Sequence, residues 1–247
     1  MPAAVVTGSS RGIGRGVALR YARDGFDVVV NYHSNEAAAT EVVEAIRETT
    51  DRDAVAVGAD VADPDAASAL VEAAVERFGS LHHVVTNAGI NEHVYPEDLT
   101  AEGFDHVMGT NVTGTYAVCR AALPHLRAAA ADGAAPSVVT VSSRLAFTGA
   151  DYEPHYAASK AAVVALTKSL ALAFAPEVRV NCVAPGYVET DMTDATNDAE
   201  DKRERRDAIP VGRLGTPDDV AEAAAYLRDA GYVTGETVQV NGGQFMR

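Results

Sequence analysis

Apolar and polar positions follow two alternating periods along the chain. Short runs of valine and alanine have the length of buried strands, and the segments between them repeat apolar positions at helical spacing. Strands are predicted at residues 3–6, 27–32, 54–59, 81–86, 137–142, 178–183 and 236–240. Helices are predicted at residues 13–24, 35–49, 64–78, 104–131, 156–174 and 216–229. Asn35 and Asp63 are the expected N-caps of the second and third helices, and Gly79 is expected to end the third.

Strands that alternate with helices of this length predict a parallel sheet with helices on both faces. We expect one α/β domain over residues 1–247, with about seven strands in a doubly wound, Rossmann-type sheet. Residues 193–207 interrupt the pattern because they are polar and densely charged. A mobile lid over a site and a solvated surface helix are both consistent with this segment.

Composition narrows the classes of partner. Aspartate and glutamate number 35 against 20 lysines and arginines, which gives a net charge of −15. Such a surface should repel nucleic acid. No run of about 18 apolar residues indicates a membrane span, and the first residues predict a strand rather than a signal peptide. We therefore expect a cytoplasmic protein. Its acidity has two interpretations, adaptation to a high-salt cytoplasm or an ordinary acidic soluble protein.

Cysteines and histidines give no metal-binding pattern. Cys119 and Cys182 are the only cysteines and are expected to be buried, small side chains. His82 and His83 start a predicted strand without ligand-like partners. We expect no metal site.

A glycine-rich segment joins the first strand to the first helix. Backbone N–H groups at such a helix start favour a pyrophosphate, and glycine lets the phosphate come close. The spacing is G-x-x-x-G-x-G rather than the common G-x-G-x-x-G, so this segment alone is a weak signal. The candidate phosphate-binding residues are Gly8, Ser10, Arg11, Gly12, Ile13 and Gly14.

The end of the second strand distinguishes NAD from NADP. NAD enzymes usually carry an acidic residue there, which bonds the ribose 2′-hydroxyl. Here the residues are Asn31, Tyr32, His33 and Ser34, and none is acidic. Arg11 supplies a cation that can bind a 2′-phosphate. The sequence therefore favours NADP(H), and the alternative is loose selectivity with Arg11 as a surface side chain.

Three residues form a candidate catalytic group. Tyr156 lies thirteen residues after Ser143, and Lys160 lies four residues after Tyr156 on the same face of a predicted helix. Bringing a tyrosine pKa from about 10 to about 7 requires about 4 kcal/mol, which one cation at about 4 Å supplies at an effective dielectric of about 20. Ser143, at a strand end, can hydrogen-bond the substrate oxygen.

Two neighbouring residues are alternatives to these. Ser142 competes with Ser143 for the role of substrate donor. His155 is one position out of phase on the helix and is expected to line the mouth of the cleft. The tyrosine–lysine pair alone is common by chance, and the serine and the glycine segment make the combination specific.

With these motifs in order, the chain resembles the short-chain dehydrogenase/reductase family over essentially its whole length. The resemblance rests on Thr7-Gly8, Gly12-Ile13-Gly14, Asn87-Ala88-Gly89, Asn111, Ser143, Tyr156, Lys160 and Pro185-Gly186. The chain departs from many members at Thr86, where they carry a second asparagine.

The resemblance implies roles for individual residues. Tyr156 would be the general acid and base, Lys160 would lower its pKa and hold the nicotinamide ribose, and Ser143 would position the carbonyl. Asn111 would hold a water in a proton relay, although it could instead cap or bend its helix. The implied cofactor contacts are Asp60 and Val61 at the adenine, Asn87, Ala88 and Gly89 beside the adenosine, and Pro185, Gly186, Val188 and Thr190 around the carboxamide; Asn87 has a partly structural role in the family.

The sequence identifies the substrate less clearly than it identifies the reaction. Within the family the chain is most similar to 3-oxoacyl-[acyl-carrier-protein] reductases, and it shares Asn31-Tyr32, Asn35-Glu36 and 155–160 with bacterial glucose dehydrogenases. Such reductases dock an acidic carrier on arginines before the fifth strand and near the end of the catalytic helix, where residues 128–135 and 174–177 here carry none. A coenzyme A thioester, a free ketone and a polyol therefore remain alternatives. The expected pocket residues are Asn91, His93, Arg144, Leu145, Tyr152, Glu153 and Tyr187.

Two classes of function remain open. The first is an active oxidoreductase on a carbonyl or secondary alcohol, assembled by resemblance as a homodimer or homotetramer through its long helices and residues 242–247. The second is an NADP-binding sensor or scaffold without catalysis. The intact set of Asn111, Ser143, Tyr156 and Lys160 favours the enzyme.

Overall fold

The computed structural model describes residues 1–190 and 199–246. In this part of the chain the strands form one sheet in the order β3-β2-β1-β4-β5-β6-β7, and every neighbouring pair is parallel. The strands are β1 (Ala3–Val6), β2 (Asp27–Tyr32), β3 (Ala54–Gly58), β4 (His83–Thr86), β5 (Ser137–Val141), β6 (Arg179–Pro185) and β7 (Thr237–Val240). The predicted doubly wound parallel sheet is confirmed.

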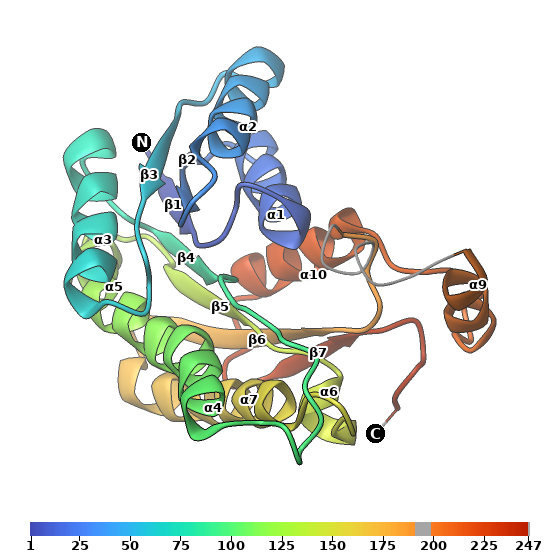
Figure 1. Ribbon diagram of the computed structural model, residues 1–247. Coiled ribbons are helices and arrows are strands. Elements are labelled where there is room, and N and C mark those ends of the chain that lie inside the picture. The colour runs from blue at the N-terminus through green and yellow to red at the C-terminus, as the bar shows by residue number, and fades with distance from the viewer. Residues whose placement is uncertain (191–198, 247) are drawn as a thin grey trace.

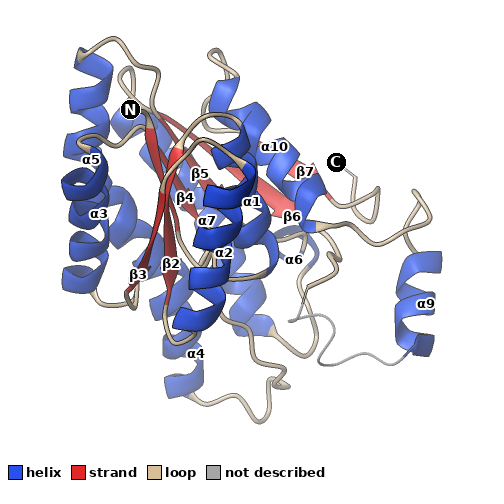
Figure 2. Ribbon diagram, turned by 90° about the horizontal axis from the view of Figure 1, so that it is seen from above, coloured by secondary structure: helices blue, strands red, loops and turns tan. Residues whose placement is uncertain are grey.

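Helices cover both faces of the sheet (Figures 1 and 2). One face packs against α1 (Gly12–Arg23), α2 (Glu36–Thr49) and α10 (Pro217–Asp229). The other packs against α3 (Pro64–Phe78), α5 (Gly114–Ala131) and α7 (Pro154–Phe174). Three shorter helices are α4 (Ala101–Met108), α6 (Leu145–Thr148) and α9 (Ala199–Asp207), and Figure 1 shows α9 standing away from the sheet.

The alternation of side chains along each strand divides the core into two layers. In β1, Ala4 and Val6 belong to the layer under α1 and α10, and Val5 belongs to the layer under α3 and α5. Strands buried on both faces have continuous apolar runs, which is the pattern that the sequence shows.

The ends of several helices follow the capping signals in the sequence. The Asn35 side chain accepts a hydrogen bond from the Ala38 N–H, and Asp63 accepts from the two N–H groups that follow Pro64. Gly79 ends α3 with a left-handed conformation, φ +79°. These predicted caps are confirmed.

The predicted helix at 104–131 is wrong in its start and its continuity. Helix α4 begins at Ala101, three residues earlier than predicted, with Thr100 as its N-cap, and a π-helical turn at Gly109–Thr113 separates α4 from α5. The turn coincides with tertiary hydrogen bonds of Asn111, described below, which local periodicity does not reveal. Smaller differences are that β4 begins at His83 rather than 81, α7 begins at Pro154 rather than 156, and β6 extends to Pro185; the one-turn α6 was not predicted.

The strand order reverses between β1 and β4, which lie side by side and send their connections to opposite sides. Such a reversal opens a crevice at the carboxyl ends of the strands. Of the charged segment 193–207, residues 199–207 form α9, and residues 193–198 lie outside the described part.

Helix α7 is long and apolar enough to cross a membrane by length and composition alone, and half of its most apolar stretch is buried. Val163, Thr167 and Phe174 of this helix lie in the protein interior, as expected of a core helix.

Candidate active site

The glycine segment brings the backbone of β1, α1 and the chain after β4 into close contact. Gly8 has φ +59°, and a Cβ there would lie 2.8 Å from the Ala88 Cα. A Cβ at Gly14 would lie 2.4 Å from the Gly8 carbonyl oxygen and 2.5 Å from the Asn87 Nδ2. Only glycine fits at these two positions, and α1 begins at Gly12 with its first N–H groups unused by the helix.

Two asparagines hold this loop in place. The Asn31 Oδ1 accepts a hydrogen bond from the Gly8 N–H at 3.0 Å, and its Nδ2 donates to backbone carbonyls of Tyr32, Val57 and Ala59. The Asn87 Nδ2 donates to the carbonyls of Thr7 and Gly8 at 3.0 Å. Both side chains therefore hold the loop in place, which agrees with the partly structural role expected for Asn87.

The predicted 2′-phosphate residues lie around the same loop. Arg11 is exposed at the N-cap position of α1, and Ser10 beside it is half-buried. His33 and Ser34 are exposed just past β2, and Tyr32 is half-buried at its end. The accessible groups at this corner are therefore one cation, a hydroxyl and an imidazole, with no carboxylate at positions 31–34.

The predicted adenine and carboxamide residues sit at two other strand ends. Asp60 follows β3 and is exposed, and Val61 is buried against Gly114 of α5. Thr190 reaches the glycine loop, since a Cβ at Gly12 would lie 3.3 Å from its Cγ2. Pro185 ends β6, Gly186 is bonded to β7 through the Val240 carbonyl, and Val188 pairs with Gly215.

The predicted catalytic residues converge between β5 and α7. Lys160 Nζ lies 5.6 Å from the centre of the Tyr156 ring and donates to the Val141 carbonyl at 2.9 Å. Ser143 is half-buried, and its hydroxyl oxygen accepts the Leu145 N–H at 3.2 Å. Tyrosine and lysine therefore share one face of the helix, as the spacing predicts.

Electrostatics around Tyr156 differ from the expectation. Burial, and after it the Glu153 carboxylate, raises the pKa of Tyr156 to about 12, and an interaction with the Ser143 hydroxyl opposes the rise. Burial also lowers the pKa of Lys160 to about 8. One lysine cation 5.6 Å from the ring centre stabilises a negative charge placed there by about 3 kcal/mol, which lowers a pKa by about 2. Lys160 alone therefore does not bring the Tyr156 pKa near 7.

Asn111 lies in the π-helical turn and is buried. Its Oδ1 accepts the Ile90 N–H at 2.8 Å, and its Nδ2 donates to the Ile90 carbonyl and to the Ser159 hydroxyl. A Cβ at Gly89 would lie 3.0 Å from Asn111 Oδ1 and 3.3 Å from Lys160 Nζ. Asn111 and the lysine ammonium therefore approach the same small space beside Gly89.

Ser142 and His155, the two alternatives to the predicted catalytic residues, have other roles. The Ser142 hydroxyl is buried and donates to the Lys160 carbonyl at 2.7 Å, which leaves Ser143 as the serine toward the cleft. His155 is fully buried, and neither ring nitrogen has a hydrogen-bond partner among the described residues. The expectation that His155 lines the mouth of the cleft is wrong, because its side of α7 faces the interior.

Several expected pocket residues gather on the substrate side. The Asn91 Nδ2 donates to the Glu153 carboxylate, and Glu153 is only 5% exposed. The Tyr152 ring lies 5.2 Å from the His93 ring. Arg144 stacks on Tyr187, with its guanidinium carbon 4.6 Å from the ring centre. Leu145, another expected pocket residue, is half-buried at the start of α6. The expected pocket thus combines a buried carboxylate with aromatic rings and a cation.

Sequence reasoning missed the roles of Thr7, Ser159 and Arg205 in this site, and it missed the effect of Glu153, an expected pocket residue, on Tyr156. Thr7 accepts the N–H groups of Asn87 and Ala88 on its hydroxyl. Ser159 fixes Asn111, Glu153 acts on Tyr156, and Arg205 of α9 stacks on Tyr187 at 4.6 Å. The position of Thr7 directly before Gly8 was an available signal. Ser159 and Arg205 contact residues of distant elements, so the sequence offered no signal for them. Glu153 lies three positions before Tyr156, a spacing that the sequence shows, but its effect on the Tyr156 pKa also depends on burial.

The remaining candidates outside the cleft are structural. Cys119 and Cys182 are buried and unpaired by disulfide, as predicted. His83 bonds the Ser137 hydroxyl at 2.9 Å and packs on Phe26, and burial lowers its pKa to about 3. No group of three potential ligands that could hold a metal occurs among the described residues.

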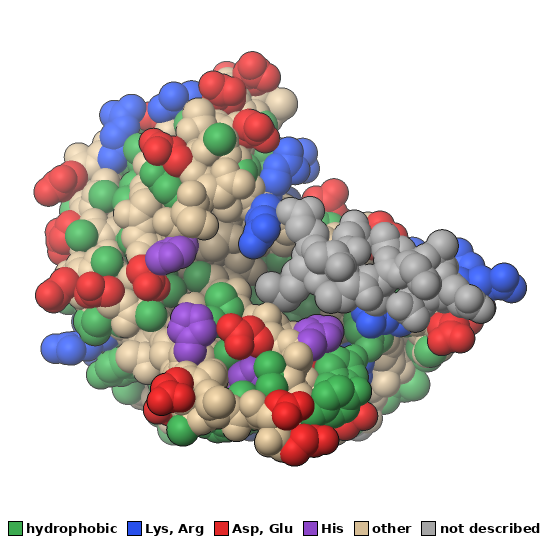
Figure 3. Space-filling view, viewed as in Figure 1, with side chains coloured by type: hydrophobic (Ala, Val, Ile, Leu, Met, Phe, Trp, Pro, Cys, Tyr) green, Lys and Arg blue, Asp and Glu red, His purple; other side chains and the backbone are tan. Residues whose placement is uncertain are grey.

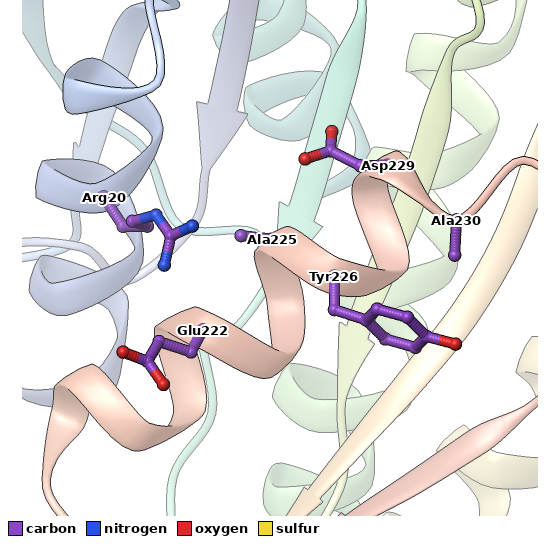
Figure 4. Close-up of a pocket in the computed structure, with 6 residues that line it drawn as sticks. All are labelled: Arg20, Glu222, Ala225, Tyr226, Asp229 and Ala230. Atoms are coloured by element: carbon purple, nitrogen blue, oxygen red, sulfur yellow. The ribbon is translucent and has the colours of Figure 1, made fainter.

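A surface recess between α1 and α10 lies apart from this site (Figure 4). Arg20 faces it from α1, and Glu222, Tyr226 and Asp229 line it from α10. None of the predicted site residues lines the recess. The space-filling view shows another hollow on the face drawn in Figure 3, between α1 and α2 above and α4, α6 and α7 below.

The described residues fit a dinucleotide. The glycine loop packs so closely on Asn87 and Ala88 that a Cβ would clash there, the start of α1 presents backbone N–H groups, and a buried ammonium lies beside the tyrosine. This donor set suits a pyrophosphate at the loop and a ribose at Lys160.

Known proteins resemble the whole chain. A family model described as "Enoyl-(Acyl carrier protein) reductase" matches residues 8–244. The 3-oxoacyl-[acyl-carrier-protein] reductase FabG of Staphylococcus aureus is 38% identical over 98% of both chains. Glucose 1-dehydrogenase 2 of Bacillus subtilis is 37% identical over 97% of this chain and 93% of its own length.

The fold has a matching solved structure. A crystal structure from Burkholderia xenovorans, assigned to the short-chain dehydrogenases/reductases, superposes with a TM-score of 0.90 at 32% identity. The match covers 99% of this chain and 98% of that one.

Proposed function

Because this chain belongs to the short-chain dehydrogenase/reductase family, we propose that it reduces the 3-oxo group of a 3-oxoacyl thioester to the 3-hydroxy form with NADPH. The chain is an oxidoreductase of this family, whose members use a nicotinamide cofactor. The proposal treats residues 1–247 as one catalytic domain. The observation that carries it is the convergence of Ser143, Tyr156 and Lys160 beside the glycine loop.

Each polar group in the cleft has a defined task in this proposal. The Ser143 oxygen accepts a backbone N–H, so its own proton is available to donate to the substrate carbonyl and orient it. Tyr156 donates its phenolic proton to the carbonyl oxygen as negative charge develops there. The Lys160 ammonium stabilises the resulting phenolate, and Asn111 holds the small space beside Gly89 in which a water would relay protons.

A bound nicotinamide supplies the hydride. The chain's part is to hold and orient it, with the pyrophosphate at the start of α1 and the 2′-phosphate at Arg11. The residues proposed to bind the cofactor are Gly8, Ser10, Arg11, Gly12, Ile13, Gly14, Asn31, Tyr32, His33, Ser34, Asp60, Val61, Asn87, Ala88, Gly89, Tyr156, Lys160, Pro185, Gly186, Val188 and Thr190. The Asn31 and Asn87 side chains serve by shaping the loop.

The carrier of the acyl chain is proposed from charge. Near the end of the catalytic helix, Arg127 is paired with Glu177, with 3.7 Å between Nε and a carboxylate oxygen. An acidic enzyme that has no arginine at residues 128–135 and 174–177 attracts an acidic carrier protein to this surface poorly. We therefore favour a coenzyme A thioester over a carrier-protein thioester. A homodimer or homotetramer in the cytoplasm is part of the same proposal.

Turnover of acetoacetyl-coenzyme A with NADPH tests the reaction. Tyr156→Phe should lower kcat by about 100- to 10,000-fold because it removes the proton donor. Tyr226→Phe is the matched control, since this tyrosine is 58% exposed on α10, outside the cleft. Full activity in Tyr156→Phe would refute the mechanism, and cofactor binding without turnover of any carbonyl would favour the sensor or scaffold.

Cofactor choice has its own test. Arg11→Ala should weaken NADPH by about 10-fold or more and NADH much less, because a charge-assisted bond to a phosphate contributes about 1.5–3 kcal/mol. Arg23→Ala, exposed in the last turn of the same helix, should leave both affinities unchanged. Equal losses for the two cofactors in Arg11→Ala would contradict the 2′-phosphate assignment.

A second candidate is oxidation of a sugar, polyol or other secondary alcohol. The buried Glu153 carboxylate and the Asn91 amide form a polar pair of the kind that binds substrate hydroxyls. Asn91 also keeps a buried Oδ1 without a partner among the described residues. Faster turnover of glucose or a polyol with NADP⁺ than of the thioester would select this candidate.

A further inference from the structure

Two arginines and a tyrosine form a stack on the substrate side of the cleft. The guanidinium carbons of Arg144 and Arg205 each lie 4.6 Å from the centre of the Tyr187 ring. Arg144 directly follows Ser143 in the chain, and Tyr187 directly follows Gly186 at the end of β6. We call these three residues the arginine stack.

The stack concentrates positive charge in an acidic protein. Its two guanidinium groups lie less than about 9 Å apart, which is close to one Debye length at physiological salt. No carboxylate of a described residue forms an ion pair with either arginine. The two like charges repel each other, and an anion placed at their edges would relieve that repulsion.

The stack borders the cleft that holds the catalytic residues. Arg205 lowers the pKa of Tyr152, whereas burial, Tyr187 and Glu153 raise it, so these side chains lie within electrostatic reach of one another. Glu153 in turn acts on Tyr156. Helix α9, although it stands away from the sheet in Figure 1, thus contributes a cation to the substrate side.

Stacked guanidinium groups are suited to oxyanions. A guanidinium that packs its face on a ring keeps its N–H edge free for two parallel hydrogen bonds to a carboxylate or phosphate. In a chain of net charge −15, an anionic substrate needs such a local cation to approach.

We propose that Arg144 and Arg205, held by Tyr187, bind an anionic group of the substrate and so set its position relative to Ser143 and Tyr156. The inference rests on the proposed function and narrows its substrates to carbonyl compounds that carry a phosphate or a carboxylate. The anion has two sources: the phosphates of a coenzyme A thioester, or the carboxylate of a short oxo acid.

Paired substrates test the inference. Acetoacetyl-coenzyme A is compared with its uncharged analogue acetoacetyl-N-acetylcysteamine, and 4-oxopentanoate with its methyl ester. Arg144→Gln and Arg205→Gln should each raise KM for the anionic member by about 10-fold or more and leave KM for the neutral member nearly unchanged. Arg203→Gln is the control, because Arg203 lies on α9 near Asp207 and is exposed.

The pattern of losses identifies the source. A loss confined to the coenzyme A pair assigns the phosphates, and a loss confined to the oxo-acid pair assigns the carboxylate. Equal losses for charged and neutral members would overturn the inference and make the stack structural. If the wild-type protein reduces neither thioester, the proposed function fails, but the oxo-acid pair still tests the arginines.

A binding measurement tests the inference even if the protein shows no turnover. Coenzyme A and 4-oxopentanoate are titrated separately into protein saturated with NADP⁺, so that the cofactor's phosphate sites are already filled. At least one of them should bind the wild type, and the Arg144→Gln/Arg205→Gln variant should lose that binding. Failure of both compounds to bind the wild type, or unchanged binding to the double variant, would refute the inference.

Discussion

Replacement of Glu153 by glutamine should lower the pKa of Tyr156 and shift the pH dependence of catalysis. Glu153 is the residue before the first turn of α7 and lies three positions before Tyr156, so the two side chains are one helical turn apart. It is only 5% exposed, and its carboxylate raises the Tyr156 pKa, second in effect to burial. Glutamine keeps an oxygen that can accept the Asn91 amide and removes the charge.

The size of the shift follows from the separation of the two groups. Side chains one helical turn apart place their charges at about 7 Å, where a carboxylate and a phenolate repel each other by about 2.4 kcal/mol at an effective dielectric of about 20, which corresponds to about 1.7 pH units. Partial screening by solvent reduces this value, so we expect the pKa of Tyr156 to fall by about 1–2 in Glu153→Gln. The sign is fixed: removal of a negative neighbour favours the phenolate and lowers the pKa.

The assay is the pH profile of kcat in both directions. Reduction needs the protonated phenol, so its rate should begin to fall at a lower pH in Glu153→Gln than in the wild type. Oxidation needs the phenolate, so its rising limb should move to lower pH by the same amount. Titration of tyrosinate absorbance, compared between Glu153→Gln and Glu153→Gln/Tyr156→Phe, isolates this one tyrosine from the other eight.

Asp151→Asn is the matched control. Asp151 is exposed two residues earlier and acts on Tyr152, but it is not among the groups that shift Tyr156. In this variant the falling limb of the reduction profile and the rising limb of the oxidation profile should both stay within a few tenths of a pH unit of the wild type. An unchanged limb in Glu153→Gln, or one that moves to higher pH, would refute the electrostatic reasoning even if kcat changes.

Three further predictions concern stability. Gly14→Ala should destabilise the fold by about 1–3 kcal/mol or more and abolish cofactor binding, because its Cβ would lie 2.4 Å from the Gly8 carbonyl oxygen. Gly231→Ala is the control, because a Cβ there meets no atom within 4 Å, and it should leave the thermal unfolding temperature unchanged. Asp219→Asn should cost about 1 kcal/mol in denaturant unfolding at neutral pH because it breaks a capping box and the pair with Arg213. The Arg213 bond holds the pKa of Asp219 below its usual range, so this difference should shrink as pH falls below about 4, and a difference that persists there would contradict the assignment. Added salt should raise the unfolding temperature if the net charge of −15 reflects a high-salt cytoplasm, and a salt-independent temperature would favour the ordinary acidic protein.

The sheet was predictable because its signals are local. Valine runs such as 27–32 are buried on both faces, and the caps at Asn35, Asp63 and Gly79 mark helix ends with side chains that bond their own backbone. The one-turn helix Leu145–Thr148 is too short to show a period. The start of α7 at Pro154 was available from the preference of proline for the first helical turn.

The π-helical turn at Gly109–Thr113 shows where local patterns end. Its sequence continues the helical period, and the interruption coincides with the hydrogen bonds of Asn111 to Ile90 and Ser159. These partners lie 21 and 48 positions away in the chain. The contact of Arg205 with Tyr187 is of the same kind, since it requires α9 to return toward the end of β6.

The environment of Tyr156 was the least accessible to sequence reasoning, because a pKa depends on burial. A motif places a cation one turn from a phenol and predicts an acidic tyrosine, but burial and Glu153 act in the opposite direction and raise the pKa of Tyr156 to about 12. At neutral pH such a phenol keeps its proton, which is the state that a carbonyl reduction consumes. The enzyme leaves the overall equilibrium unchanged, so the carboxylate acts only on the pH range in which each direction proceeds. In the proposed mechanism Glu153 should therefore favour reduction near neutral pH and restrict alcohol oxidation to alkaline pH, and its replacement should bring the pH ranges of the two directions closer together.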